Sequence, residues 1–167
     1  MDQQCFAPGI SYSRPELKFF IRRRGSFTLV AEQEDEGTAG TRANQRGGKV
    51  ASGDIAGGNV TKKIASESAA SRIAGFIVTQ PGRTGHIITI DVASSARRSG
   101  VGSQLLQAAE NRLRADGGKA VGLETAVDNL PALAFYKRHG YSVIETVPRY
   151  YSNGVDALRM RKDLTSA

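Results

Sequence analysis

The chain lacks the features on which disulfide-bonded, metal-binding and membrane-spanning proteins depend. Cys5 is the only cysteine among 167 residues, which excludes an internal disulfide and any Cys/His metal cluster. No apolar run approaches the ~18–20 residues that a membrane-spanning helix needs. The first ten residues contain Asp2 and no hydrophobic block, which argues against a secretory signal. These absences predict a protein of a reducing, cytoplasmic compartment with no membrane partner.

Acidic residues are also few relative to basic ones. The chain has 23 Lys and Arg against 16 Asp and Glu, a formal net charge of +7, and such a balance favours anionic partners. The arginines are scattered, however, and are not concentrated with aromatic residues in one tract. A charge that assists encounter with a phosphorylated ligand is therefore favoured over nucleic-acid binding, which would show strong, salt-dependent affinity for RNA or DNA.

Length and composition predict one domain over residues 1–167, since 40% hydrophobic residues suffice for a single core. Between Gly37 and Val60, seven of 24 residues are glycine and the others are mostly small or polar. Such a stretch cannot bury enough apolar surface to offset its ordering entropy. We predict a flexible Gly-rich insertion at about 37–71 between two strands of one sheet, because the entropy of loop closure grows slowly with length.

Capping residues and hydrophobic periodicity predict an α/β order of elements. Ser13 and Pro15 mark the start of the first helix, and Gly25 marks its end. The expected helices are 13–24, 101 to about 116–118, and 129–139, and the expected strands are 27–31, 72–79, 86–92, 119–125, 141–146 and 155–160. A strand, a loop, a helix and a strand in succession after residue 86 indicate a parallel crossover.

The most informative segment is Arg97-Arg98-Ser99-Gly100-Val101-Gly102, which joins the strand 86–92 to the helix 101–115. The first N–H groups of a helix lack partners within it, and the helix dipole adds partial positive charge, so such a loop is suited to hold phosphate. Gly100 and Gly102 let an anion approach the backbone. Arg97 and Arg98 add donors and full charges.

The same segment excludes two other phosphate motifs. No Lys-Ser or Lys-Thr pair follows the glycines, so the segment is not a nucleotide P-loop, and no third glycine stands at the dinucleotide-binding spacing. On these residues alone, a surface turn with two solvated arginines stays open as the alternative.

Three further segments follow in order: Leu123-Glu124-Thr125-Ala126-Val127-Asp128-Asn129, then Ala134-Phe135-Tyr136-Lys137-Arg138-His139-Gly140-Tyr141, then Pro148-Arg149-Tyr150-Tyr151 with 156–164 behind it. Together with Arg97-x-x-Gly100-x-Gly102, they resemble the GNAT acetyltransferase family. More narrowly, they resemble its ribosomal-protein alanine N-acetyltransferase branch and the N-terminal acetyltransferase relatives. The resemblance is strong over about 87–164 and weaker over 16–30, and the insertion has no counterpart in it.

This resemblance implies an α/β GNAT fold, in which a mixed central sheet is splayed between two parallel strands and helices cover both faces. It implies acetyl-CoA as the acetyl donor, with the diphosphate on the loop amides and the pantetheine arm between the strands 86–92 and 119–125. Main-chain groups at the end of the first strand would polarise the thioester carbonyl. Asn129 would help to hold the arm, although asparagine there is also an excellent helix N-cap. The implied cofactor-binding residues are Ile90, Asp91, Val92, Arg97, Arg98, Ser99, Gly100, Val101, Gly102, Ser103 and Asn129.

The resemblance also assigns the acid–base chemistry. The attacking amine must lose a proton, because an α-amino group has a pKa of ~8, and the departing thiolate is better off gaining one. Glu124 matches the general base of this branch, acting directly or through water, and Tyr136 matches the general acid. From the residues alone, Glu124 could also be an exposed strand-end carboxylate, and Tyr136 a core aromatic. The two histidines are interpreted as structural, His86 at a strand edge and His139 at a helix C-terminus.

The acceptor site is implied by Tyr150 and Tyr151, which match a tyrosine pair lining the groove for a peptide's first residues; hairpin packing is the alternative. The implied activity is direct acetyl transfer, in a ternary complex, to the N-terminal α-amine of a protein, with a ribosomal protein as one candidate. Cys5 is a poor candidate for a nucleophile. A lysine side chain or small-molecule amine as acceptor stays open. So does a non-catalytic acetyl-CoA-binding module, because residues 1–12 are too few for the strand and helix that begin the family's fold.

Overall fold

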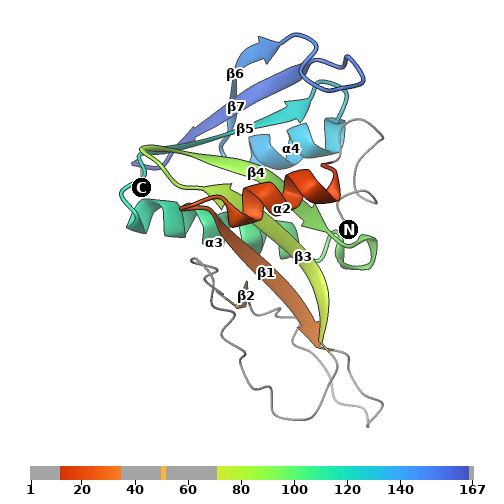
Figure 1. Cartoon of the computed structure of the whole chain (residues 1–167), viewed down its shortest axis with the longest axis vertical. Helices are drawn as coiled ribbons and strands as arrows, with labels where there is room; N and C mark the ends of the chain where they lie inside the picture. The colour runs from red at the N-terminus through yellow and green to blue at the C-terminus, as the bar shows by residue number, and fades with distance from the viewer. Residues whose placement is uncertain (1–11, 35–49, 52–70, 166–167) are drawn as a thin grey trace.

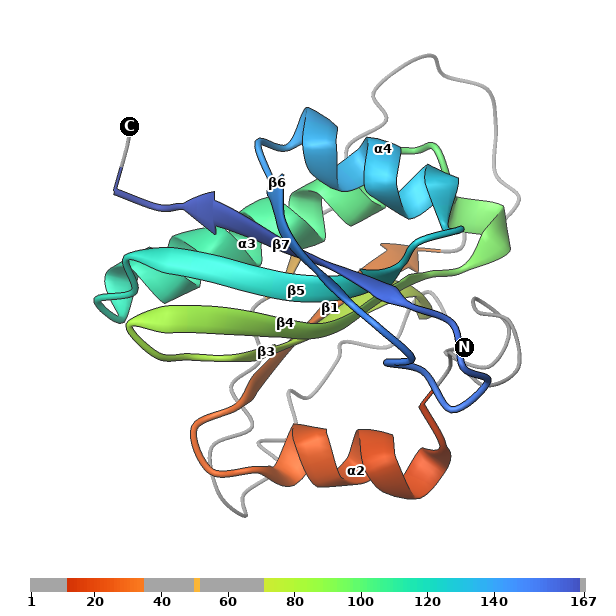
Figure 2. The same cartoon turned by 90° about the horizontal axis from the view of Figure 1, so that it is seen from above.

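One mixed sheet organises the part of the chain that the computed structural model describes, residues 12–34, 50–51 and 71–165. Helix α2 lies over one face of this sheet, and helices α3 and α4 lie over the other (Figures 1 and 2). The strand order is β2-β1-β3-β4-β5-β7-β6. The elements are α2 (Arg14–Arg22), β1 (Phe27–Glu34), β2 (Val50–Ala51), β3 (Ser71–Gln80), β4 (Thr84–Val92), the 3-10 helix η1 (Ser94–Ala96), α3 (Val101–Ala115), β5 (Ala120–Ala126), α4 (Leu130–Arg138), β6 (Ser142–Val147) and β7 (Ala157–Asp163).

Helix α2 begins where the sequence predicts, because Ser13 caps it. The Glu16 backbone N–H donates to the Ser13 hydroxyl at 3.4 Å, and the Ser13 backbone N–H donates to the Glu16 carboxylate at 2.8 Å. The two residues thus satisfy each other's backbone amides. Pro15 occupies the first turn, where its missing N–H costs little. Gly25, with φ of 85°, turns the chain from the helix into β1.

Strands β1 and β3 pair antiparallel, from Phe27 opposite Thr79 to Glu34 opposite Ser71. This confirms that the second strand continues the sheet that the first begins. Most of the predicted insertion at about 37–71 lies outside the described residues, and its flexibility stays a prediction. Its residues Val50–Ala51 form β2, which pairs with the outer edge of β1, where the sequence indicates no strand.

Strands β4 and β5 are parallel neighbours only at their beginnings. Their pairing runs from Thr84 opposite Ala120 to His86 opposite Gly122. Beyond this point β4 stays paired with β3, and β5 stays paired with β7, so the two halves of the sheet separate. The predicted mixed sheet, splayed between two parallel strands and covered by helices on both faces, is confirmed.

The main core lies between α3 and the sheet. Leu105, Leu106 and Leu113 of α3 are almost completely buried, at the spacing of one helix face, and each contributes about 1.5–3 kcal/mol by burial. Gly85 of β4 permits this packing, because a Cβ there would lie 2.7 Å from a methyl group of Leu113. The sheet side of the core is formed by buried residues that include Ile77, Val78, Val121, Leu123 and Met160.

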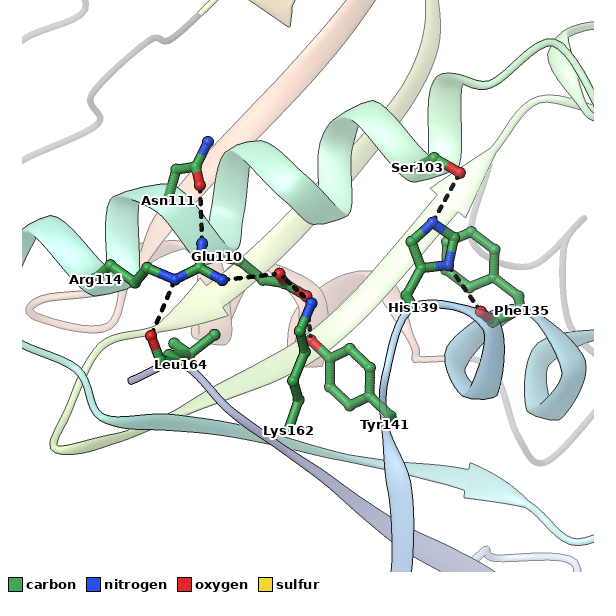
Figure 3. A network of polar contacts seen from close by, with 9 residues as sticks. All are labelled: Ser103, Glu110, Asn111, Arg114, Phe135, His139, Tyr141, Lys162 and Leu164. Carbon is green, nitrogen blue, oxygen red and sulfur yellow. Dashed lines mark hydrogen bonds and ion pairs between the residues drawn. The ribbon is translucent and has the colours of Figure 1, made fainter. Parts of the chain in front are cut away.

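A buried carboxylate on α3 ties this helix to the last two strands (Figure 3). Glu110, only 5% exposed at its side chain, accepts the Lys162 ammonium at 2.6 Å and lies 3.7 Å from Arg114. The Tyr141 hydroxyl donates to the same carboxylate at 3.1 Å. Because a buried carboxylate needs such partners, the network ties β7 and the residue before β6 to α3.

Among the described helices, none is both long and apolar enough to span a bilayer. The described side chains also form no group of His, Cys, Asp and Glu that could hold a metal ion.

Candidate active site

A cavity of about 850 Å³ lies where β4 and β5 separate. Both strands, the loop before α3, the first turns of α3 and α4, and the loop between β6 and β7 contribute to its wall. The residues that line it are Tyr12, Ile87, Ile88, Thr89, Ile90, Val92, Arg97, Arg98, Gly100, Gly102, Ser103, Leu123, Glu124, Thr125, Ala126, Asn129, Pro131, Ala132, Ala134, Phe135, Tyr136, Arg138, Tyr150 and Tyr151.

One end of the cavity is the N-terminus of α3. Gly100 caps this helix in the left-handed conformation, with φ of 90°, and no side chain caps its first amides. Arg98 is also left-handed, with φ of 63°, a strained state for a residue with a Cβ. Arg97 donates from Nε to the Val92 carbonyl at 3.2 Å, which fixes the loop to the end of β4. Uncapped helix amides beside two arginines fit a diphosphate.

The predicted cofactor residues divide into two groups. On the cavity wall lie Ile90, Val92, Arg97, Arg98, Gly100, Gly102, Ser103 and Asn129. The side chains of the other three make hydrogen bonds or packing contacts within the protein. Asp91 is buried and accepts the Thr89 hydroxyl at 3.0 Å, Ser99 donates to the Ala96 carbonyl at 2.7 Å, and Val101 packs against the core.

For Asn129, the structure confirms the helix-cap role that the sequence leaves open, and the cofactor role stays a prediction. Its Oδ1 accepts the backbone N–H of Ala132 at 3.2 Å, so it caps α4. The residue also lines the cavity.

The predicted base, Glu124, lies on the α2 face of the sheet. Gly85 faces Leu113 of α3, so its neighbour His86 points to the opposite face. The Nε2 atom of His86 lies 3.0 Å from Oε2 of Glu124. The interpretation of His86 as a simple strand-edge residue therefore missed a direct contact with the predicted base.

Glu124 belongs to a row of charged side chains across four strands. Arg159 of β7 is paired with Glu124 and donates from Nε to its Oε1 at 2.9 Å, and it also binds Glu145 of β6. We call His86, Glu124, Arg159 and Glu145 the charged row. Burial raises the pKa of Glu124, but hydrogen bonds and charges from His86 and Arg159 outweigh it and hold this pKa below its ordinary value. The carboxylate is therefore ionised at neutral pH.

The predicted acid, Tyr136, approaches from the other face. It lies on α4, is 7% exposed, and packs edge-to-face against Phe135 and Tyr141. Burial, and then the neighbouring Tyr151 and Asp91, raise the pKa of Tyr136 well above its ordinary value. The phenol thus keeps its proton at neutral pH. Because both Tyr136 and Glu124 line the cavity, it is bordered by a carboxylate on one face of the sheet and a phenol on the other.

The two tyrosines of the β6–β7 loop also line the cavity. The rings of Tyr150 and Tyr151 meet edge-to-face with centroids 5.0 Å apart. Arg149, with φ of 50°, turns the chain before them, and its backbone N–H donates to the Asp156 carboxylate at 2.7 Å. The two tyrosines thus pack against each other in the hairpin and also line the cavity, and their role in peptide binding stays a prediction.

Two further residues line the cavity that no sequence motif marks as part of the site, Arg138 and Tyr12. Arg138 ends α4 on the cavity wall, and Tyr12 stands at the N-terminal side, with its ring against Phe20 at 5.2 Å. A basic residue in the last turn of a helix that follows a cavity strand was the available signal for Arg138. No local signal marks Tyr12, because its position depends on how α2 lies over the sheet.

Comparison with known proteins agrees with this geometry. A family model described as acetyltransferase (GNAT) family matches residues 3–141. The N-alpha-acetyltransferase of Saccharolobus solfataricus is 32% identical over 83 residues, which cover 49% of this chain and 50% of that protein. The chain thus spans about half the length of the curated relatives it matches.

Three solved structures of similar fold are 27–35% identical to this chain. Ard1 from Thermoplasma volcanium is 35% identical, with a TM-score of 0.53 over 55% of this chain and 63% of that one. The ribosomal-protein-S18-alanine N-acetyltransferase from Escherichia coli is 27% identical, with a TM-score of 0.52 over 57% and 64%. The NatC complex bound to Gag peptide and CoA is 29% identical, with a TM-score of 0.51 over 55% and 61%. With the splayed sheet, the uncapped helix N-terminus and a family match over most of its length, the chain belongs to the acetyltransferase (GNAT) family.

Proposed function

We propose that this protein transfers the acetyl group of acetyl-CoA directly to the N-terminal α-amine of a protein, in a ternary complex. The observation that carries this proposal is one cavity with an uncapped helix N-terminus at one end and Glu124 and Tyr136 on opposite faces of the sheet. Similarity to proteins named N-alpha-acetyltransferase supports a peptide acceptor. A ribosomal protein is the finer proposal, supported by similarity to the ribosomal-protein-S18-alanine enzyme.

The cofactor end follows from the chain's own groups. When bound, acetyl-CoA supplies an activated acetyl group as a thioester. The amides at the start of α3, with Arg97 and Arg98, would hold its diphosphate. Arg138 adds a third guanidinium to the same wall. The edge of β4 that faces away from β3 would hold the pantetheine arm, because β5 leaves this edge after Gly122.

For the base, the contacts favour a pair of residues over a single carboxylate. The lowered pKa of Glu124 makes its carboxylate a weak proton acceptor. His86, 3.0 Å from it, carries an imidazole, the side chain used most often as a general base. We therefore assign proton removal from the amine, directly or through water, to the His86–Glu124 pair, in which the ionised carboxylate orients the ring and stabilises its positive charge.

For the acid, the raised pKa of Tyr136 decides whether this phenol transfers its proton to the departing sulfur or only donates a hydrogen bond to it. A thiol has a pKa of ~8.5, far below that of this buried phenol, so complete proton transfer from Tyr136 to a thiolate is unfavourable. Tyr136 is better suited to donate a hydrogen bond to the departing sulfur. Such stabilisation acts where negative charge develops.

Tyr150 and Tyr151 would receive the first residues of the acceptor. Tyr150 is 44% exposed at the cavity mouth. Burial, and then the charge of Glu124 and a hydrogen bond to it, raise the pKa of Tyr150, so its hydroxyl keeps its proton, and its oxygen can accept a hydrogen bond from the backbone of a peptide. An α-amine at the cavity mouth would then face Glu124, with His86 on the carboxylate behind it.

The experiment is a panel of acceptors tested with radiolabelled acetyl-CoA. It contains a peptide with a free N-terminus, the same peptide with a blocked N-terminus and an internal lysine, and spermidine as a small amine. We expect product only with the free N-terminus. Acetylation confined to lysine or spermidine would contradict the acceptor proposal. Binding of acetyl-CoA without turnover on any acceptor would favour a non-catalytic binding module.

A further inference from the structure

Behind the wall of the diphosphate end, a chain of hydrogen bonds joins the two cavity helices. Ser103 lies in the first turn of α3 and lines the cavity. Its Oγ is 3.0 Å from Nε2 of His139, and Nδ1 of His139 is 2.8 Å from the Phe135 carbonyl oxygen. Figure 3 shows the imidazole between the two, with one nitrogen toward each.

The Phe135 carbonyl fixes where the imidazole carries its hydrogen. A carbonyl oxygen can only accept, so Nδ1 must donate. In the neutral ring, Nε2 then has no hydrogen and can only accept, which requires the Ser103 hydroxyl to donate to it. The hydroxyl hydrogen is thus held away from the cavity, and the lone pairs of Oγ are left to face a bound anion, which is unfavourable.

A second proton on His139 reverses this bond. Both ring nitrogens then donate, the Ser103 oxygen accepts from Nε2, and the hydroxyl hydrogen is released toward the cavity. The ring also caps the C-terminus of α4, where the helix dipole favours a cation.

Some charged groups around the His139 ring oppose a positive charge on it, and others favour one. Lys137 and Arg138 in the last turn of α4 oppose a positive ring, as do the loop arginines across the cavity end. From β7, Lys162 passes beside the next residue, Gly140, with its ammonium on Glu110 of α3. A bound diphosphate is the group that tips this balance, because it adds negative charge at the Ser103 side.

We propose that His139 is a positioning residue for the diphosphate of acetyl-CoA, which takes up a proton on binding and thereby turns the Ser103 hydroxyl toward the ligand. This rests on the proposed acetyl-CoA site. The proposal predicts the direction of the pH dependence. Because the bound state holds one more proton, the affinity for the ligand rises as pH falls, by at most about tenfold per pH unit. The rise ends where the ring of the free protein is already charged.

The test is calorimetric titration of the full chain with 3′-dephospho-CoA, which keeps the diphosphate and lacks the titrating 3′-phosphate. Titrations at pH 7.5 in buffers of different ionisation enthalpy give the number of protons taken up. We expect a measurable uptake, up to one proton, by the wild type. His139→Gln, which can donate and accept hydrogen bonds but does not titrate, and Ser103→Ala should both lose this uptake. Arg112→Gln, which removes a cation of α3 at a residue outside the cavity wall, is the control and should keep it.

Two outcomes overturn the proposal: no uptake by the wild type, or equal uptake by the wild type and His139→Gln. If His139→Gln does not fold, unchanged uptake by Ser103→Ala has the same meaning. Binding of acetyl-CoA but not of 3′-dephospho-CoA would overturn the role of the diphosphate and leave the proposed function standing. Failure to bind either ligand would overturn both.

Discussion

The Nε2 atom of His86 lies 3.0 Å from Oε2 of Glu124, on the same sheet face, and Glu124 lines the cavity. The other carboxylate oxygen, Oε1, accepts from Arg159 at 2.9 Å. One oxygen of Glu124 is thus held by a permanent cation and the other by a group that can gain or lose a proton. This division of the carboxylate gives Glu124 a fixed orientation.

Glu124→Gln should reduce turnover by about 10²-fold or more, because the amide cannot stabilise a positive charge on His86. The affinity for acetyl-CoA should stay within about twofold, since the diphosphate end is untouched. Steady-state rates with a free-N-terminus peptide, together with calorimetric binding, separate the two effects. Glu145→Gln is the matched control, because Glu145 binds the same arginine but lies outside the cavity wall. Equal losses in both variants would assign the effect to the charged row as a structural unit.

Glu124 should also contribute to stability in a pH-dependent way. Its pKa is lowered from 4.5 in the folded state. The contribution is therefore complete above about pH 4.5 and is lost as pH falls through the lower folded value. We expect Glu124→Gln to lose less stability than the wild type between pH 5 and pH 3, measured as the shift in the urea midpoint. Parallel midpoint curves for the two proteins would contradict this.

Much of the fold could be predicted because its signals are local. Ser13 with Glu16, Gly25 and Asn129 fix the ends of elements through contacts within a few residues. The loop before α3 is equally local, since its glycines and arginines act through the adjacent helix terminus. These features do not depend on how the rest of the chain packs.

The charged row could not be predicted, because it depends on register between distant strands. His86 and Arg159 reach Glu124 only when β4, β5 and β7 lie side by side in the observed alignment. A shift of one residue in any strand would turn these side chains to the other face. The contact between Glu110 and Lys162 could not be predicted either, because these residues are 52 positions apart in the chain.

Asp156 should control acceptor binding through the tyrosine loop. Its carboxylate accepts the backbone N–H of Arg149 at 2.7 Å, and its carbonyl accepts that of Val127 at 3.1 Å. Asp156→Ala removes the first bond and should loosen the position of Tyr150. We expect KM for a peptide to rise several-fold while KM for acetyl-CoA stays unchanged, measured by varying each substrate in turn.

Arg149→Gly provides the matched comparison, because glycine adopts the observed φ of 50° without strain and keeps the N–H that Asp156 accepts. Its KM for the peptide should change less than that of Asp156→Ala. If Asp156→Ala raised KM for both substrates alike, the loop would not be specific to the acceptor.

Gly75 of β3 should prove intolerant of a side chain, because a Cβ there would lie 2.6 Å from the Asp91 carbonyl oxygen. A backbone atom cannot move aside as a flexible side chain does, so β3 and the end of β4 must separate. We expect Gly75→Ala to cost about 1–3 kcal/mol, a fall in Tm of roughly 2–4 °C per kcal/mol in a domain of this size. Gly122→Ala is the control, since its Cβ would meet the Met160 carbonyl oxygen at 3.4 Å, an ordinary contact distance. Because Asp91 adjoins the β4 edge at the gap, Gly75→Ala should also weaken acetyl-CoA binding. An unchanged Tm together with an unchanged affinity would show that the two strands tolerate the separation.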